Sequence, residues 1–177
     1  MALKDSRTCK IGAGVVAVAG GFALLLSAGG PALAGSSSGT TTTTAAVTST
    51  ITLSGLTSAF TITGNPSSTV TSTGATTMNV LTNNQTGYAV TVQAAAATLA
   101  PATTGNTDSI PIGNLKVKDG GATTYAALSN TTATTVHSTT AKSISAGDTV
   151  TNDYQLAIPF VNSDNYTATL NYIAATH

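Results

Sequence analysis

Apolar and polar residues alternate one by one along much of the chain after residue 46. The clearest run spans 88–94 and follows a polar turn that contains Asn83, Asn84 and Gly87. Alternation with a period of two places one set of side chains on each face of a β-strand. Aromatic and β-branched residues, which favour strands, occupy most positions of one set. The inward set of this predicted half-buried strand is Tyr88, Val90, Val92 and Ala94.

Shorter alternating runs, separated by Gly, Asn, Ser and Asp, continue to the C-terminus. The alanine run at 94–97 is a good helix former, but Pro101 leaves room for a turn or so of helix. A β-helix would need a fixed repeat length, which the sequence lacks. Many short strands with frequent turn signals predict an all-β fold, an antiparallel β-sandwich of the Ig-like type. Predicted strands include 47–53, 59–63, 68–73, 76–82, 110–112, 115–118, 149–159 and a last one from Tyr166 onward.

The first 34 residues have the features of a signal peptide. Three basic residues precede the apolar stretch at 11–26, and Ala32-Leu33-Ala34 offers a small-x-small cleavage site. An N-terminal membrane anchor is the alternative, since the apolar stretch approaches the length that spans a bilayer. Gly29-Gly30-Pro31 interrupts it just before the cleavage site and favours removal. We therefore expect a secreted chain, located outside a bacterial cell or on its wall, with no membrane attachment after cleavage.

Three parts follow from this reading: a signal peptide at 1–34, a flexible Thr/Ser/Gly-rich extension at 35–46, and one β-sandwich domain at 47–177. The extension has no core-forming residues and is typical of a spacer. A second interpretation stays open, in which the extension and the first strand pair with the sheet edge of a neighbouring molecule. Val47, Ile51 and Leu53 are the candidate residues of that strand-exchange segment.

Composition narrows the possible functions. The single cysteine, Cys9, lies in the predicted leader, so disulfides, thiol chemistry and cysteine-based zinc sites are excluded for the secreted part. Charged residues make up only 7% of the chain, and no basic patch of the kind that binds nucleic acid is present. A surface with so little charge also offers little repulsion against self-association.

The sequence shows no pattern typical of a catalytic or cofactor site. Its two histidines are His137, beside Ser138, and the terminal His177, and adjacency alone does not make a nucleophile–base pair. Asp148, Asp153 and Asp164 match no calcium-loop spacing. We therefore expect a non-enzymatic protein without catalytic residues, metal or cofactor.

The few aromatic rings allow two interpretations. They can fill the core of the sandwich, or a tyrosine row at a sheet edge can stack on the sugar rings of a glycan. The rings concerned are Phe60, Tyr88, Tyr125, Tyr154, Phe160, Tyr166 and Tyr172.

Two segments together resemble the WxL-domain surface proteins of Gram-positive bacteria. Gly-Tyr-Ala-Val-Thr-Val at 87–92 is similar to the Gly-Trp-x-Leu-Thr-Val segment of that family. Tyr-Thr-Ala-Thr-Leu-Asn-Tyr-Ile-Ala at 166–174 is similar to its closing Tyr-x-Ala-x-Leu-x-Trp-x-Leu strand. The resemblance covers roughly 51–176. Tyr88 and Tyr172 stand at the two tryptophan positions.

This resemblance implies a β-sandwich held non-covalently on the cell wall through peptidoglycan. We therefore expect a secreted surface protein whose partner is peptidoglycan or a wall-associated protein, with Tyr88, Val90, Tyr166 and Tyr172 as candidate contact residues. The alternative function is a structural subunit that associates with itself into an extracellular fibre or matrix by β-strand addition.

Overall fold

A computed structural model describes residues 35–177, so the predicted leader lies outside the described residues. Residues 35–50 have no regular secondary structure, and all of their side chains are exposed. Ala45–His177 forms a compact unit. No helix within the described part of the chain is long and apolar enough to cross a membrane.

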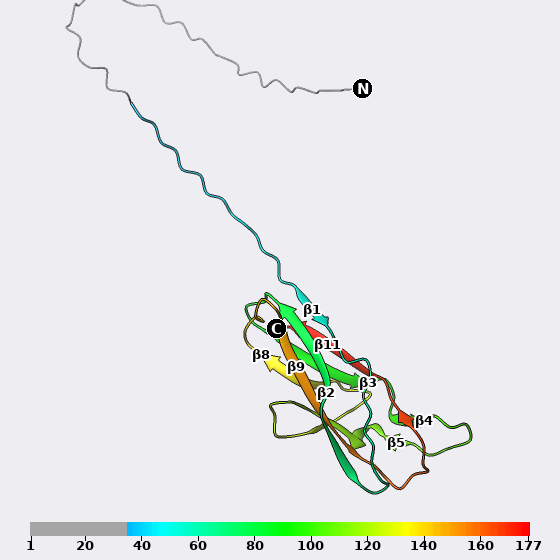
Figure 1. Cartoon of the computed structure of the whole chain (residues 1–177). Helices are drawn as coiled ribbons and strands as arrows, with labels where there is room; N and C mark the ends of the chain where they lie inside the picture. Colours follow the sequence, from blue (N-terminus) through cyan, green and yellow to red (C-terminus); the bar gives the residue numbers. More distant parts are fainter. Residues whose placement is uncertain (1–34) are drawn as a thin grey trace, which may run out of the picture. The chain divides into compact units, whose positions relative to one another are not determined.

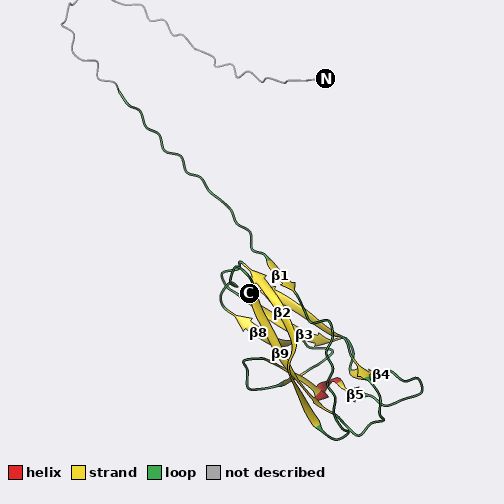
Figure 2. Cartoon of the chain, in the orientation of Figure 1, coloured by secondary structure: helices red, strands yellow, loops and turns green. Residues whose placement is uncertain are grey.

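The described chain is almost entirely β-structure, and every strand pair in it is antiparallel. Figure 2 shows strands and loops with a single short 3₁₀ helix, η1. The all-β prediction is confirmed. In chain order the elements are β1 (Ile51–Ser54), β2 (Thr69–Thr82), β3 (Tyr88–Ala94), β4 (Thr98–Pro101), β5 (Ile110–Pro111), η1 (Ile112–Asn114), β6 (Leu115–Asp119), β7 (Ala126–Ala127), β8 (Thr134–Thr139), β9 (Asp148–Ala157), β10 (Tyr166–Thr167) and β11 (Leu170–Thr176).

The strands form two layers around one apolar core (Figure 1). One layer is a five-stranded sheet in the order β1-β2-β9-β6-β7. The other contains β11-β3-β8 and is continued by β10-β4-β5, since β4 follows β3 and β10 precedes β11 along the chain. Buried side chains from β2, β9 and β6 join those of β3 and β8 in a single cluster. This is a β-sandwich arrangement.

Strand β3 lies at the centre of its sheet and matches the predicted alternation. Its residues are in turn buried and half-buried from Tyr88 to Ala94, as the period of two requires. The Tyr88 hydroxyl donates a 2.9 Å hydrogen bond to Asp148 at the start of β9. Burial, and then this carboxylate, raise the pKa of Tyr88 well above its usual value. The tyrosine is therefore a neutral link between the two layers.

Several predicted strand boundaries differ from the structure. The strand expected at 47–53 begins only at Ile51. The two expected at 68–73 and 76–82 are one strand, β2, whose register with β9 shifts between Ser72 and Thr76. Such a β-bulge inserts extra residues without ending the strand, and Gly74, at a φ of 62°, supplies the necessary backbone conformation.

The strand predicted at 59–63 does not form, although its side chains alternate as expected. Phe60 and Ile62 are half-buried and pack against the core, whereas Ala59, Thr61 and Thr63 are exposed. Gly55, with a φ of 63°, turns the chain out of β1. The segment then has no neighbouring strand in the described sheets.

Candidate functional site

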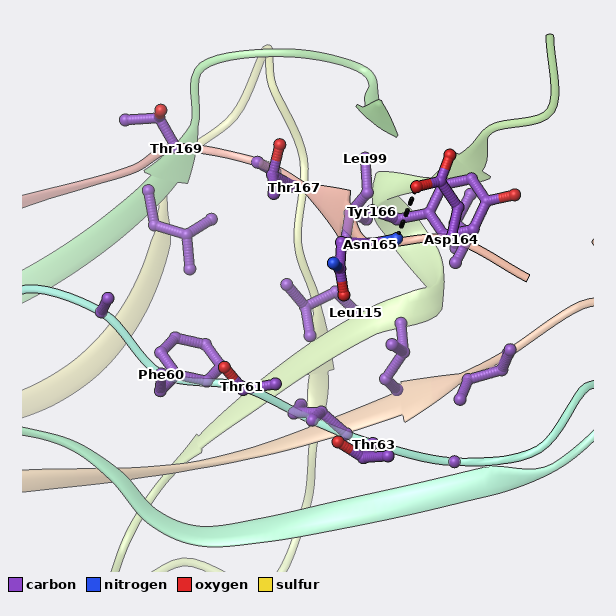
Figure 3. Close-up of a pocket in the computed structure, with 18 of the residues that line it drawn as sticks. Phe60, Thr61, Thr63, Leu99, Leu115, Asp164, Asn165, Tyr166, Thr167 and Thr169 are labelled. Atoms are coloured by element: carbon purple, nitrogen blue, oxygen red, sulfur yellow. Dashed lines mark hydrogen bonds between the residues drawn. The ribbon is translucent and has the colours of Figure 1, made fainter. Parts of the chain in front are cut away.

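A cavity of about 970 Å³ lies between the two layers of the described domain and is here called the interlayer groove. One wall is formed by residues 56–66 and the other by residues 161–172, as Figure 3 shows for part of its length. Buried apolar side chains from the strands lie beneath the walls. These floor residues are Leu99, Ile110, Leu115 and Leu156, with half-buried Ile158 beside them.

The first wall makes backbone hydrogen bonds only near its two ends. At its start, the Thr57 amide donates to the Thr77 carbonyl oxygen at 3.0 Å, and the Thr77 amide donates to the Thr57 hydroxyl at 3.0 Å. From there, residues 58–64 make no backbone hydrogen bond to any part of the described chain. Unpaired main-chain groups of this kind can be satisfied by water or by an added strand. The wall therefore resembles a sheet edge with its neighbour missing.

Gly64 holds the far end of this wall close to the core. A Cβ atom at this position would lie within 2.8 Å of the Ile158 Cδ1 atom and would also collide with Val70. A side chain at this position would require Val70 of β2 and Ile158, just after β9, to move, and glycine avoids this. The direction of the first wall is thus fixed at its end as well as at Thr57.

The second wall is held by a hydrogen-bond network around Asp164. Its carboxylate accepts hydrogen bonds from the Asn106 side chain at 2.8 Å, the Thr103 amide at 3.1 Å and the Asn165 amide at 2.8 Å. The Asn165 bond is the dashed line in Figure 3. These donors, with the Asn106 amide first, lower the pKa of Asp164 to about 2. The network ties the loop before β10 to the loop after β4.

The second wall also ends in a sheet edge. Strands β10 and β11 are outermost in their sheets, paired with β4 and β3 on one side only. Burial alternates along it as it does along the first wall. Tyr166, Ala168, Leu170 and Tyr172 are half-buried, and the residues between them are exposed.

Aromatic hydroxyls close the inner end of the groove. Phe60 packs on Tyr154 with 4.5 Å between ring centroids. The hydroxyls of Tyr154 and Tyr172 are hydrogen-bonded to each other, and that of Tyr172 also lies 3.0 Å from the Thr76 hydroxyl. Burial raises the pKa of both tyrosines above their usual values. The groove therefore ends in a neutral, mainly apolar cluster.

The predicted contact residues fall into two groups. Tyr88 and Val90 have no exposed surface in the described structure, so their side chains cannot contact a ligand there. Tyr88 and Tyr154 are core residues, as the first of the two interpretations of the rings expects. Tyr166 and Tyr172 instead line the interlayer groove and remain half-buried.

The candidate strand-exchange residues are also divided. Ile51 and Leu53 lie in β1, where they pair with Thr82 and Val80 of the same molecule and pack against the core. Val47 lies before β1 and is 84% exposed. Only the part of the segment before β1 is therefore open to exchange in this structure.

The histidines and aspartates do not gather into one site. His137 Nδ1 lies 2.7 Å from the Asp119 carboxylate, whereas the Ser138 hydroxyl faces His177 Nε2 at 3.4 Å. Residues 35–177 contain no group of three metal-ligating side chains. The three aspartates considered for calcium lie apart: Asp148 bonds Tyr88, Asp153 bonds Lys118, and Asp164 bonds Asn106.

The two segments that resemble the WxL domain lie side by side. Strand β11 pairs with β3 along its whole length, so that Tyr172 lies opposite Val92 and Thr176 opposite Tyr88. No family model matches the chain, and the comparison with curated proteins finds no match.

Sequence reasoning did not predict the groove. The alternation at 59–63 indicated which side chains face inward, but it contains no information on whether a neighbouring strand is present. Phe160, one of the rings for which the sequence left core and surface open, is 89% exposed and lies next to the lining residue Val161. Its signal in the sequence is a phenylalanine in the short turn Pro-Phe-Val-Asn at 159–162.

Proposed function

We propose that this chain is a secreted, non-enzymatic cell-surface protein that attaches non-covalently to the cell wall by receiving an extended polypeptide of a wall-associated protein in its interlayer groove. The observation that carries this proposal is the first wall: residues 58–64 run beside an apolar floor without a backbone partner. The apparent signal peptide and the low charge of the chain support a location outside the cell.

The walls favour a polypeptide over a glycan. An added strand can form main-chain hydrogen bonds along an open edge, and it can place alternate side chains on the apolar surface between the walls. Each such bond contributes roughly 0.5–1.5 kcal/mol net. Sugar stacking has less support, because Tyr88 is buried and Tyr166 and Tyr172 are half-buried.

A pair of matched double variants tests this role of the backbone. Ser58→Pro with Thr61→Pro removes two amide donors from the first wall, whereas Ser58→Ala with Thr61→Ala keeps them. Both side chains are exposed, and neither residue makes a backbone hydrogen bond within the described chain. The proline variant should therefore fold but lose ladder bonds to an incoming strand. Circular dichroism and thermal unfolding establish that the two variants are equally folded.

The assay is co-sedimentation of the exported protein with isolated cell walls. Walls that retain their proteins should pellet the wild type and the alanine variant, and most of the proline variant should stay in solution. Sacculi stripped of protein should pellet little of any variant. Equal pelleting of the proline and alanine variants would contradict the proposal, as would equal binding to stripped sacculi.

A second candidate function is a structural subunit of an extracellular fibre. It is favoured by the exposed extension before β1, which offers the chain its own source of an added strand. Pelleting without walls, followed by filaments in electron micrographs, would support it. Protein that stays dispersed at all concentrations would exclude it.

A further inference from the structure

We infer that the interlayer groove receives the N-terminal extension, residues 35–50, of a second copy of this chain, so that molecules join head to tail. This inference rests on the strand-accepting role proposed above and adds a second occupant of the groove, which competes there with the polypeptide of a wall-associated protein. Four observations on the described residues lead to it: where the extension starts, what it is made of, which direction it would run, and which exposed apolar side chains it would bring together.

The extension and the outer mouth of the groove lie at opposite ends of β2. The extension begins beside the end of β2, at Thr82, whereas the outer mouth is at Pro66, just before β2 starts. Asn83, just after β2, accepts a hydrogen bond from the Thr50 amide and donates one to the Thr48 carbonyl, both at 2.8 Å. The groove begins near Thr76, in the middle of β2, and reaches Pro66, just before β2 starts. A strand of this length spans roughly 45 Å. A contact between two different ends of the same molecule is heterologous, and it produces an open filament wherever the rotation between successive copies does not close a ring.

The composition of the extension suits the groove. Residues 35–50 carry no charged side chain, and the single charged residue in the groove lining, Asp164, already accepts several hydrogen bonds within its own loop. Threonine and valine are good strand formers. Val47 and Ala45 share one parity and would face the apolar surface together. At about 3.3 Å per residue, the sixteen residues 35–50 are ample for the eleven-residue wall from Leu56 to Pro66.

The positions of the ends fix the direction of the added strand. In a head-to-tail pair, Thr50 of the donor lies at the Pro66 end of the acceptor's groove. Traced from Thr50 back to its N-terminus, the donor strand then runs inward along the groove toward Tyr172. It then lies parallel to the first wall, 56–66, and antiparallel to the second wall, 161–172. This orientation places Val47 of the donor near Ile62 of the acceptor, both facing the apolar surface, and Thr48 of the donor near Thr63 on the exposed face.

The same arrangement brings together exposed apolar side chains from both ends. Phe160 is 89% exposed beside the outer mouth of the groove. Leu81 and Ile144, 44% and 65% exposed, line a second depression of about 660 Å³ that also includes Thr50 at the root of the extension. Joining the ends would remove these apolar side chains from water, which favours the contact.

Disulfide trapping between two populations tests this geometry. The secreted part of the chain has no cysteine of its own, so Thr48→Cys in one population and Thr63→Cys in the other provide the only thiols. Both positions are exposed. Mixed under a mild oxidant, they should form at least tenfold more mixed dimer than a control mixture of Thr48→Cys with Ser145→Cys, whose exposed thiol lies at the root end.

Three results would overturn the inference. The first is mixed dimer no more abundant than in the control, and the second is trapping that is unchanged when Thr63→Cys is combined with Ser58→Pro and Thr61→Pro. The third is a Thr48→Cys/Thr63→Cys double variant that forms its disulfide only within single molecules. The wall assay, run in parallel, separates the two proposals. If trapping fails while wall binding remains sensitive to the proline pair, the groove takes another polypeptide, and this inference alone is wrong. If both fail, the strand-accepting role is wrong as well.

Discussion

The two ends of this sandwich follow the same alternating pattern but reach different states. Around β3, Tyr88, Val90 and Val92 have no exposed surface, and each lies in a strand with partners on both sides. Around the interlayer groove, Phe60 and Ile62 point inward equally regularly but remain half-buried, in a segment without a partner. Alternation orients side chains in both regions, whereas only a neighbouring strand completes the burial.

This difference assigns different roles to the two regions. The closed region contains the interlayer bond from Tyr88 to Asp148 and most of the fully buried side chains, so it should account for most of the stability. The open region contains unpaired main chain beside apolar surface, which is the feature required to bind a strand. Substitutions should therefore affect folding in the first region and association in the second.

The largest effect is expected for Tyr88→Ala in the closed region. Loss of a fully buried ring typically destabilises by about 3–5 kcal/mol, and here Asp148 also loses a hydrogen-bond donor. Tyr88→Phe keeps the ring and should cost less, about 1–3 kcal/mol. Urea unfolding of the three proteins measures the free energies. A loss below 1 kcal/mol for Tyr88→Ala would contradict the central role of this residue.

Truncations of aliphatic side chains in the core and in the groove wall should cause a smaller loss of folding stability, and the loss should differ between the two places. Met78→Ala removes a side chain that is 1% exposed and should cost about 2–5 kcal/mol. Ile62→Ala removes a half-buried one from the groove wall and should cost about 1 kcal/mol, since much of its surface already meets water. The ranking is read from urea midpoints. If both variants lose equal stability, the groove wall is as tightly packed as the core.

Alkaline pH should destabilise the folded domain through the tyrosine pair at the inner end of the groove. Tyr154 and Tyr172 have raised pKa values in the folded state. Unfolding therefore releases protons above pH 10, the ordinary tyrosine value, and stability falls as pH rises beyond it. Tyr154→Phe should reduce this slope while leaving Tyr172 bonded to Thr76. Thermal melts between pH 8 and 11 test this, and an unchanged slope would argue against the assignment.

The smallest effect concerns an ion pair away from the groove. Asp153 lies 2.7 Å from the Lys118 ammonium and also accepts a hydrogen bond from the Gly74 amide. These partners, Lys118 first, lower the pKa of Asp153 below its usual value. The stabilisation is present above about pH 4 and is lost as pH falls through the lowered pKa. Asp153→Asn should therefore flatten the acid side of the stability profile. If stability falls at acid pH in this variant as steeply as in the wild type, the loss comes from other carboxylates.

The sequence predicted the closed region well and the open region poorly, for one physical reason. The alternation at 88–94 determined both the strand and its inward side chains, because a central strand has partners on both sides. The same pattern at 59–63 predicted the inward positions of Phe60 and Ile62 but not the absence of a ladder, which depends on elements more than 100 residues away. Strand β4 was missed because the alanine run before it indicated a helical turn.

The candidate residues show the same limit. A tyrosine in an alternating run faces either the core or an edge, and the local sequence does not distinguish the two. Tyr88 lies in the core, whereas Tyr172, in the neighbouring strand, lines the groove. The groove itself arises where two distant segments, 56–66 and 161–172, face each other without a strand between them.

Amide hydrogen exchange along residues 58–64 tests the open edge most directly. At low protein concentration these amides should exchange rapidly while those of the paired strands β2 and β9 stay protected. On association, with a wall protein or with further copies, 58–64 should gain protection and β2 should change little. Strong protection of 58–64 in the dispersed protein, or no change on association, would contradict the claim that this edge receives a strand.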